Sequence, residues 1–576
     1  MRKNFDNIIA FTLSTIGSLF LVYYIFRGST DVVSSDYIRI INYYIDDVTD
    51  LKYLLSWESI SRIPFTFLAR FINVKCFHYS VFFDRILGIL GLFIFNFTLI
   101  KYIFKKYVLD IIKVTLSIIV TLISFSLMSW EMILNGTGYP HFITVGLIAI
   151  TFYNFESITG KINFGKKTFI KDFLFDFLFI VYGLSNYLLV FLARYIFVRD
   201  EYGMSSRYAI QYMFLTIGII LILSKFIDFA LQEFFSVNNV AKANDKIKDE
   251  AINKMDEEEF KINDIKESKT IIFKFLPLYI LISFTSLLFA GSYAVSYICT
   301  LILFSFLMPI IYIIEGKNIE SSKTNSDVAK ENIKTKNDYV KVFIPYFILI
   351  ILSIVCLMCY FKSNSVGETL AIVGAKDITL IELLKDDLTF PIRFLLKSLA
   401  SSIIGVETFD YAINFGTITE KIIFLYGILY ILIILFTIFI IFYMILYHNK
   451  KNMNEAKIKN IIVDDISSKK EDVVNRKEDF IISNRTKWRK VFLILISVLC
   501  IGVFLIGHLA TTTDEIFKAD YRKIIYTNLE GVAKDFRNYS DEELMNFFEY
   551  RRDPNHIKEA LETLERQKLN IFYEGR

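Results

Sequence analysis

The side chains best suited to chemistry lie just beyond the first long apolar run. The segment 34–44 (SSDYIRIINYY) sets a carboxylate, Asp36, three residues before a guanidinium, Arg39, among several tyrosines. At that spacing on a helix, the two side chains share a face and could simply pair. Asp36 could equally be a general base that removes a proton from an acceptor hydroxyl. We expect Asp36 to be the catalytic residue.

Arginines form the second group of candidates. Each could pair with an acid or reach lipid headgroups, but together they favour phosphate, which a guanidinium binds through two parallel hydrogen bonds. Arg207-Tyr208 lies at the start of a long apolar run. Arg194 lies at the end of the preceding run, at a similar depth, and Arg199 comes five residues later. The residues expected to bind a lipid phosphate are Arg39, Arg62, Arg194, Arg207 and Tyr208.

A third group lies in the segment 130–141 (WEMILNGTGYPH). Two glycines and a proline within so short a segment predict a tightly folded turn. Glu131 and His141 frame it, and either could ligate a metal, bind a sugar acceptor or assist proton transfer. The same two side chains could instead cap two helix ends.

These groups must be positioned by helices that cross a membrane. The 576 residues are 54% hydrophobic, with a mean hydropathy of +0.46. About eleven apolar runs recur along the chain; the fourth is short, and runs of roughly twenty residues can cross a roughly 30 Å hydrocarbon core. Only helices satisfy their own backbone there, so the predicted fold is an all-α polytopic membrane protein. The runs are 8–26, 82–104, 109–129, 142–155, 173–193, 208–227, 271–290, 293–314, 341–361, 421–447 and 490–510.

Lysine-rich segments predict the orientation, because positive charge favours the cytoplasmic side. The blocks 238–270, 316–340 and 448–489 then become solvated cytoplasmic linkers, and the N-terminus lies inside. The outer side receives the segments 27–80, 130–141, 194–207, 362–420 and 511–576. Interfacial helices are expected in the first and fourth of these, and a small helical region in the last.

The domain organisation follows from these boundaries. Residues 1–237 form a membrane module that holds the catalytic part, and 271–315 form a helical hairpin. Residues 341–447 contain two spans joined by the outer loop 362–420, and 490–510 form the last span before the tail 511–576.

Several function classes are disfavoured by the sequence. A net charge of +4, with lysines scattered over loops, does not indicate nucleic-acid binding. The chain contains no GxxxxGK[ST] motif for ATP and no HExxH zinc motif. Few ionisable residues fall near the middle of a span, where a proton-coupled transporter usually has them.

The chain resembles bacterial polytopic membrane proteins of cell-surface polysaccharide assembly and, more distantly, the GT-C class of glycosyltransferases. The GT-C likeness is architectural over most of the chain, and its specific part is Asp36-Tyr37 just beyond the first span. Closer likenesses, to uncharacterised Gram-positive membrane proteins, are the segments 130–136, 206–208, 511–515 and 568–572.

This resemblance implies an inverting glycosyltransferase of the bacterial plasma membrane, with a polyprenyl-phosphate-linked sugar as donor and a cell-envelope glycan as acceptor. Many GT-C members carry paired acidic residues where this chain has Asp36-Tyr37, so a divalent cation remains open as a cofactor. The alternatives are a flippase or polymerase of lipid-linked sugars and a non-enzymatic scaffold of polysaccharide assembly.

Overall fold

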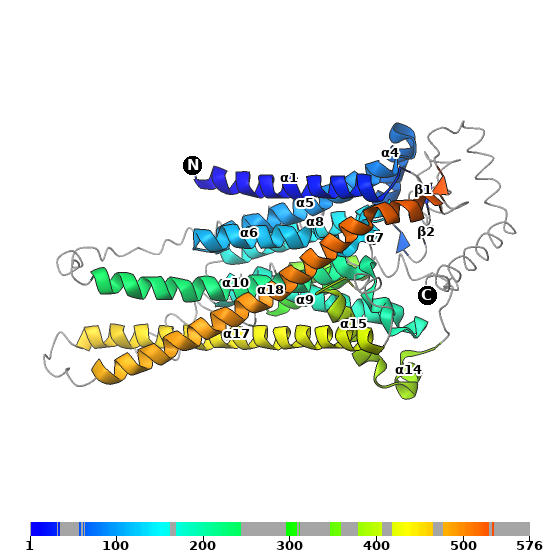
Figure 1. Cartoon of the computed structure of the whole chain (residues 1–576). Coiled ribbons are helices and arrows are strands. Elements are labelled where there is room, and N and C mark those ends of the chain that lie inside the picture. Colours follow the sequence, from blue (N-terminus) through cyan, green and yellow to red (C-terminus); the bar gives the residue numbers. More distant parts are fainter. Residues whose placement is uncertain are drawn as a thin grey trace.

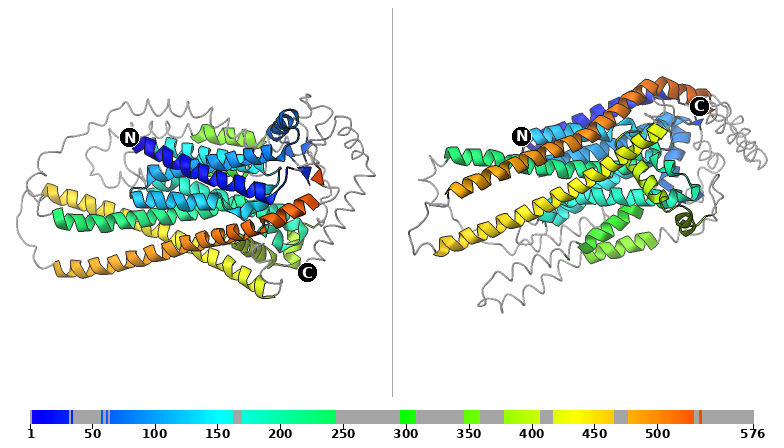
Figure 2. Two further views of the ribbon diagram at one scale, coloured as in Figure 1. Left: turned by 45° about the horizontal axis from the view of Figure 1, so that its top comes forward. Right: turned by 60° about the horizontal axis from the view of Figure 1, so that its bottom comes forward.

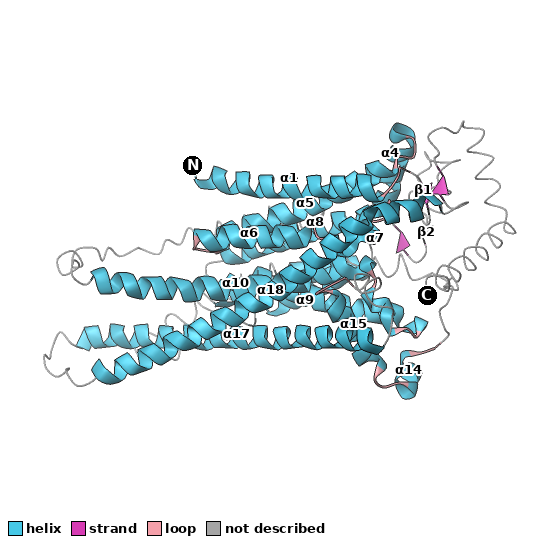
Figure 3. Cartoon of the chain, in the orientation of Figure 1, coloured by secondary structure: helices cyan, strands magenta, loops and turns pink. Residues whose placement is uncertain are grey.

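Long helices running side by side dominate the computed structural model (Figures 1 and 3). The structure describes residues 2–31, 33–34, 57–58, 61–62, 64–161, 169–243, 295–307, 310, 346–358, 378–405, 417–464, 476–528 and 533–534. The long helices are α1 (Arg2–Gly28), α5 (Val81–Lys106), α6 (Asp110–Ser124), α8 (Tyr139–Lys161), α9 (Phe169–Arg194), α10 (Ser206–Ala243), α17 (Thr417–Asp464) and α18 (Arg476–Asn528).

Seven helical segments in the described part of the chain are long and apolar enough to cross a membrane. They are Phe5–Gly28, Val81–Lys106, Asp110–Leu134, Asp172–Phe197, Ser206–Phe234, Glu420–Tyr447 and Trp488–Asp520. The all-helical membrane class predicted from the sequence agrees with this, whereas the structure supports seven candidate spans where about eleven were expected. The run 142–155 forms α8 without joining the seven. Val295–Leu307 and Tyr346–Met358 are shorter apolar helices, and 271–290 lies outside the described residues.

Glycines allow the central helices to approach closely. A Cβ atom added to Gly146 of α8 would lie 2.6 Å from the carbonyl oxygen of Gly91 in α5. On the other side of the core, a Cβ atom on Gly183 of α9 would lie 2.5 Å from the backbone nitrogen of Leu215 in α10. In lipid, helix association depends on such close packing, so these crossings require a residue without a side chain.

The helices alternate in direction, so their connections gather at two ends. α1, α6, α9 and α18 run toward one end, and α5, α8, α10 and α17 run away from it (Figure 1). That end contains the described residues 29–31, 33–34, 125–138, 195–205, 378–405 and 533–534, and we call it the loop end. Described parts of all five segments predicted to share the outer side lie there, while the face of the membrane that it occupies stays a prediction.

Short elements fill the loop end. They are α4 (Pro64–Phe77), the 3-10 turns η1 (Leu127–Ser129), η2 (Tyr195–Phe197) and η3 (Asp200–Met204), and the helices α7 (Trp130–Leu134), α14 (Leu380–Asp386) and α15 (Phe390–Ser401). Strand β1 (Val33–Ser34) pairs antiparallel with β4 (Ala533–Lys534), and β2 (Trp57–Glu58) pairs with β3 (Ser61–Arg62). The β1–β4 pair joins the segment after α1 to the segment after α18.

Helices extend into segments predicted as linkers or tail. α10 ends at Ala243, α17 at Asp464, and α18 crosses obliquely over the other helices as far as Asn528 (Figure 2). The polar segment 511–515 does not interrupt α18, because the Thr511 and Thr513 hydroxyls donate to carbonyls one turn earlier, at 3.0 and 2.8 Å. The remaining predicted tail helices lie outside the described residues.

Candidate functional site

Glu131 and Arg207 meet at the loop end. Glu131 lies on the five-residue helix α7, and Arg207 is the second residue of α10. The Nε and Nη2 atoms of Arg207 lie 2.5 Å from Oε1 of Glu131, and the Ser206 hydroxyl donates to Oε2 at 3.1 Å. A carboxylate is favourable here because a helix N-terminus carries partial positive charge.

Arg194 and Tyr208 extend this site. The Arg194 Nε donates to the phenol oxygen of Tyr208, and its guanidinium lies 5.6 Å from the Tyr208 ring centre and 5.7 Å from that of Phe197. Tyr208 also interacts electrostatically with Arg207 and Glu131. Three of the residues predicted to bind a lipid phosphate, Arg194, Arg207 and Tyr208, therefore lie together.

The turn that precedes His141 is as tight as its glycines predict. The Asn135 side chain accepts hydrogen bonds from the backbone and hydroxyl of Thr137, both at 3.0 Å. A Cβ atom on Gly138 would lie only 1.9 Å from the Met132 carbonyl oxygen, so no other residue fits. This turn leads into α8, where His141 is close enough to Arg207 to interact with it electrostatically. Both residues that frame the turn thus belong to the site.

The remaining predicted site residues are not part of this cluster in the described structure. Asp36 and Arg39 lie outside the described residues. Arg62 forms the end of β3, where its backbone pairs with that of Trp57. The chain enters the segment 35–56 from β1, at the loop end.

Helix α18 holds α7 in position, a relationship that the sequence analysis missed. The Arg522 guanidinium stacks on the Trp130 indole at 3.5 Å, and Glu515 orients it through contacts of 3.1 and 3.3 Å. The Leu127 backbone N–H donates to the Thr512 hydroxyl at 3.1 Å. Trp130 is the residue before Glu131, so α18 fixes the backbone that presents the carboxylate. The polar segment 511–515 was the only sequence signal of this role.

A second ionic cluster, also missed, attaches α15 to the turn after Arg194. Asp200 accepts hydrogen bonds from Arg393 and Lys397, both at 2.7 Å, and Arg393 also donates to Asp387 at 2.6 Å. Hydrogen bonds from Arg393, and then from Thr389, lower the pKa of Asp387 to about 2. Val198, in the same turn, has a φ of 52°, which β-branched residues rarely adopt. Its conformation therefore depends on these surrounding contacts.

A sealed ion pair anchors α4 against the turn from the other side. Arg70 and Asp84 contact each other with both side chains 0% exposed. Arg70 also donates to the Gly136 carbonyl at 2.8 Å, and Asn73 donates to Asp84 at 2.8 Å. These contacts fix the turn that carries Glu131 and His141 at its two ends.

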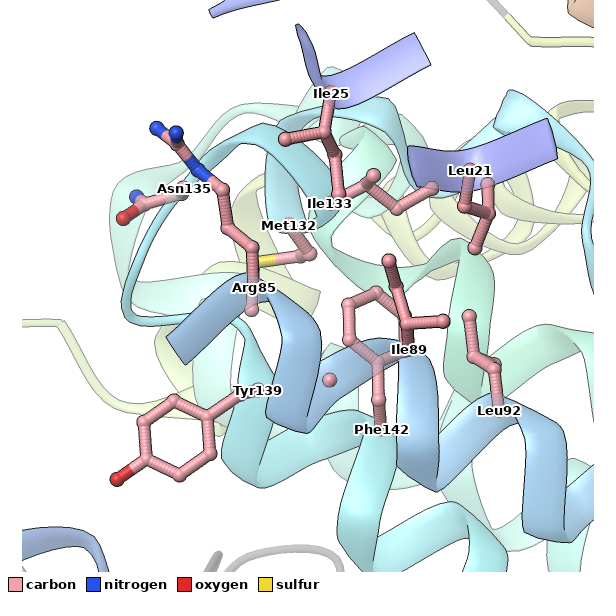
Figure 4. Close-up of a pocket in the computed structure, with 11 residues that line it drawn as sticks. Leu21, Ile25, Arg85, Ile89, Leu92, Met132, Ile133, Asn135, Tyr139 and Phe142 are labelled. Carbon is pink, nitrogen blue, oxygen red and sulfur yellow. The ribbon is translucent and has the colours of Figure 1, made fainter. Parts of the chain in front are cut away.

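The cavity shown in Figure 4 lies beside this turn, between α1, α5 and α8. It measures about 10 Å³, room for about one water molecule. Arg85 and Asn135 line one side and apolar side chains the other (Figure 4). Arg85 donates to the carbonyls of Leu134 and Thr30, at 2.8 and 2.9 Å. The cavity is too small for a sugar, so a large substrate would meet the Glu131–Arg207 cluster from outside.

The described residues contain no preformed set of metal ligands. No group of three or more His, Cys, Asp or Glu side chains there could hold an ion. The described cysteines Cys76, Cys299, Cys356 and Cys500 form no disulfide bonds.

No family model, curated protein or solved structure matches this chain. Its function must therefore be argued from the chemistry of the site. The Arg207 side chain is 54% exposed, whereas Glu131 is 18% exposed. The open guanidinium can bind an anion arriving from solvent or from a lipid surface, and the carboxylate beside it can accept a proton.

Proposed function

We propose that this protein is a membrane glycosyltransferase that moves a sugar from a polyprenyl-phosphate donor to a cell-envelope glycan. The observation that carries the proposal is the meeting of Arg194, Arg207 and Tyr208 with Glu131 and His141 at the loop end. Three cation or hydroxyl groups suited to a phosphate stand there beside two groups suited to proton transfer.

The depth of the arginines supports a lipid-linked donor. Arg207 is the second residue of the candidate span Ser206–Phe234, and Arg194 lies three residues before the end of Asp172–Phe197. Side chains at span ends reach the headgroup layer, where the phosphate of a polyprenyl lipid lies. We propose that the loop end faces the outer side of a bacterial plasma membrane, as the lysine distribution predicts.

The proposed reaction needs two kinds of group. An acceptor hydroxyl attacks the anomeric carbon and loses its proton to a carboxylate, for which we propose Asp36. The bond between that carbon and the phosphate oxygen breaks, and the polyprenyl phosphate leaves with the electron pair. Arg207 and Arg194 would stabilise the charge on this leaving group by donating hydrogen bonds to its oxygens.

The test is sugar transfer by purified protein in liposomes that contain a radiolabelled polyprenyl-phosphate sugar and a glycan acceptor. We expect transfer with inversion at the anomeric carbon. Arg207→Ala should lower the rate by about 10²–10³-fold, as loss of a transition-state donor does, and Asp36→Asn should abolish transfer without preventing insertion. Lys385→Ala removes an exposed cation from α14 at the same end of the bundle and should transfer normally.

Failure of the wild type to transfer any sugar would reject the enzyme. Equal losses in Arg207→Ala and Lys385→Ala would reject the site, because the effect would then follow net charge.

A flippase is the second candidate, and one observation favours it. Lys225 of α10 pairs with Asp176 of α9 inside the bundle, with side chains 9% and 0% exposed. Ionisable groups inside a span are a frequent feature of transport pathways. Movement of intact donor lipid across the liposome membrane, without transfer, would select this candidate. We favour the enzyme because the Lys225 ammonium donates to Tyr102, to the Asp172 carbonyl and to Asp176, so all its donors already have partners.

A further inference from the structure

We propose that the Glu131–Arg207 ion pair is a latch that a phosphate anion opens by exchanging with the Glu131 carboxylate on Arg207. The Glu131 carboxylate then competes with the phosphate for the Arg207 guanidinium, and it also lies beside the phosphate site. The inference rests on the proposed function only for the source of the phosphate, a lipid headgroup. The exchange itself concerns any phosphate that reaches Arg207.

The geometry of the pair leaves Arg207 better bonds to make. Its Nε and Nη2 atoms both lie 2.5 Å from the same carboxylate oxygen, Oε1. The second oxygen, Oε2, accepts from the Ser206 hydroxyl at 3.1 Å. A guanidinium binds more strongly when its two donors reach two oxygens in parallel. A phosphate has enough oxygens to do this and carries more negative charge than a carboxylate.

The exposure of the pair makes the exchange feasible. With Arg207 54% exposed, an incoming anion can contact the guanidinium before Glu131 departs. Ion pairs of this exposure shift an equilibrium by only about 1.4- to 5-fold. The latch is therefore strong enough to compete with phosphate and weak enough to be displaced.

Tyr208 supplies a further donor beside the exchanged anion. Its phenol oxygen accepts a hydrogen bond from Arg194, so the hydroxyl hydrogen must point elsewhere. Among the described residues that hydrogen has no acceptor, and Tyr208 is close enough to Arg207 to interact with it electrostatically. A phosphate on Arg207 could accept this hydrogen and so be held by two residues.

Glu131 stays nearby after the exchange. Its backbone is held through Trp130, on which Arg522 stacks at 3.5 Å. Opening the latch thus requires only a side-chain rotation, which leaves a carboxylate next to the bound phosphate, able to accept a proton.

The test measures binding of farnesyl phosphate and of inorganic phosphate to the full-length protein in detergent, by isothermal titration calorimetry. We expect Glu131→Gln to bind farnesyl phosphate about 2- to 5-fold more tightly than wild type, since the competing charge is lost. Arg207→Ala, alone or with Glu131→Gln, should weaken binding at least tenfold. Glu382→Gln, an exposed acid on α14 at the same end, should match the wild type.

A dissociation constant that is unchanged or raised in Glu131→Gln overturns the latch, as does the absence of binding in both proteins. If Glu131→Gln does not elute as a folded monodisperse species, Ser206→Ala replaces it, and its loss of the bond to Oε2 should also tighten binding. If Glu131→Gln binds both phosphates more tightly by the same factor, the latch recognises the phosphate group alone. If only farnesyl phosphate binds more tightly, the latch also recognises the lipid chain. Tightening without sugar transfer in liposomes would keep the latch and reject the glycosyltransferase.

Discussion

Two ion pairs with the same chemistry occupy opposite situations in this molecule. Lys225 donates to Asp176, to the Asp172 carbonyl and to the Tyr102 hydroxyl, and Tyr102 donates to the second oxygen of Asp176 at 2.9 Å. The three ammonium hydrogens all have acceptors, and the pair is sealed between α5, α9 and α10. Arg207 and Glu131 meet at the surface, with the arginine 54% exposed. The contrast teaches that burial and completeness separate a structural ion pair from one that can change partners.

The largest expected effect on stability comes from breaking the buried Lys225–Asp176 pair. Lys225→Met leaves the Asp176 carboxylate buried without its cation, and such a loss costs about 3–5 kcal/mol of stability. We expect a correspondingly lower concentration of denaturant at the midpoint of unfolding in mixed micelles. The measurement is the loss of helical circular dichroism with increasing SDS.

The double variant Lys225→Met with Asp176→Leu is the control for this prediction. It removes both charges and should recover most of the stability, because replacing a buried pair by apolar groups is often neutral. If Lys225→Met were as stable as the wild type, the Lys225–Asp176 pair would not be a structural ion pair, and it would not differ from the Arg207–Glu131 pair in this respect.

A more local effect is expected where α18 supports the open site. Arg522→Gln removes the cation from the Trp130 indole, a contact worth about 0.5–2 kcal/mol, and also from the Glu515 carboxylate, which is 1% exposed. The backbone around Glu131 should loosen, so hydrogen exchange in the peptide 126–134 should become faster while that of α8 does not change. Equal exchange in the wild type and Arg522→Gln would show that α18 does not position Glu131.

The sequence was sufficient to predict elements but not their partners. Seven of the eleven apolar runs coincide with the candidate spans. The glycines of 130–141 predict a tight turn, and the turn requires glycine at position 138. Glu131 and Arg207 were both chosen as candidates, yet nothing along the chain indicates that they pair, because they are 76 residues apart. Periodicity reports which face of a helix is apolar, not which helix lies against it.

The same limit explains what was missed. Arg522 and Glu515 belong to the polar end of a long helix, and only packing brings them to Trp130. Asp176 stands near a helix end in the sequence and is nonetheless 0% exposed, because α5 and α10 cover it. Its position near a helix end agrees with the sequence, but its burial could not be predicted from that position.

The open pair itself should contribute little to stability. A double-mutant cycle of Glu131→Gln and Arg207→Gln should give a coupling energy of about 0.2–1 kcal/mol, the usual value for exposed pairs. The measurement is the same SDS unfolding. A coupling above about 3 kcal/mol would place this pair with Lys225–Asp176 and leave no room for partner exchange.

The smallest effect is expected at the pair of Asp387 with Arg393, whose side chains are both 34% exposed. Their hydrogen bonds, and those from Thr389, lower the pKa of Asp387 to about 2, below the value of about 3.9 for an unfolded aspartate. Because the folded-state pKa is the lower one, the stabilisation is complete above about pH 4 and is lost as the pH falls toward 2. Hydrogen exchange of the peptide 378–405, corrected for the intrinsic rate, should therefore accelerate between pH 4 and 2. Asp387→Asn should already exchange faster at pH 5 and show no further step, and an identical step in both proteins would assign the transition to another carboxylate.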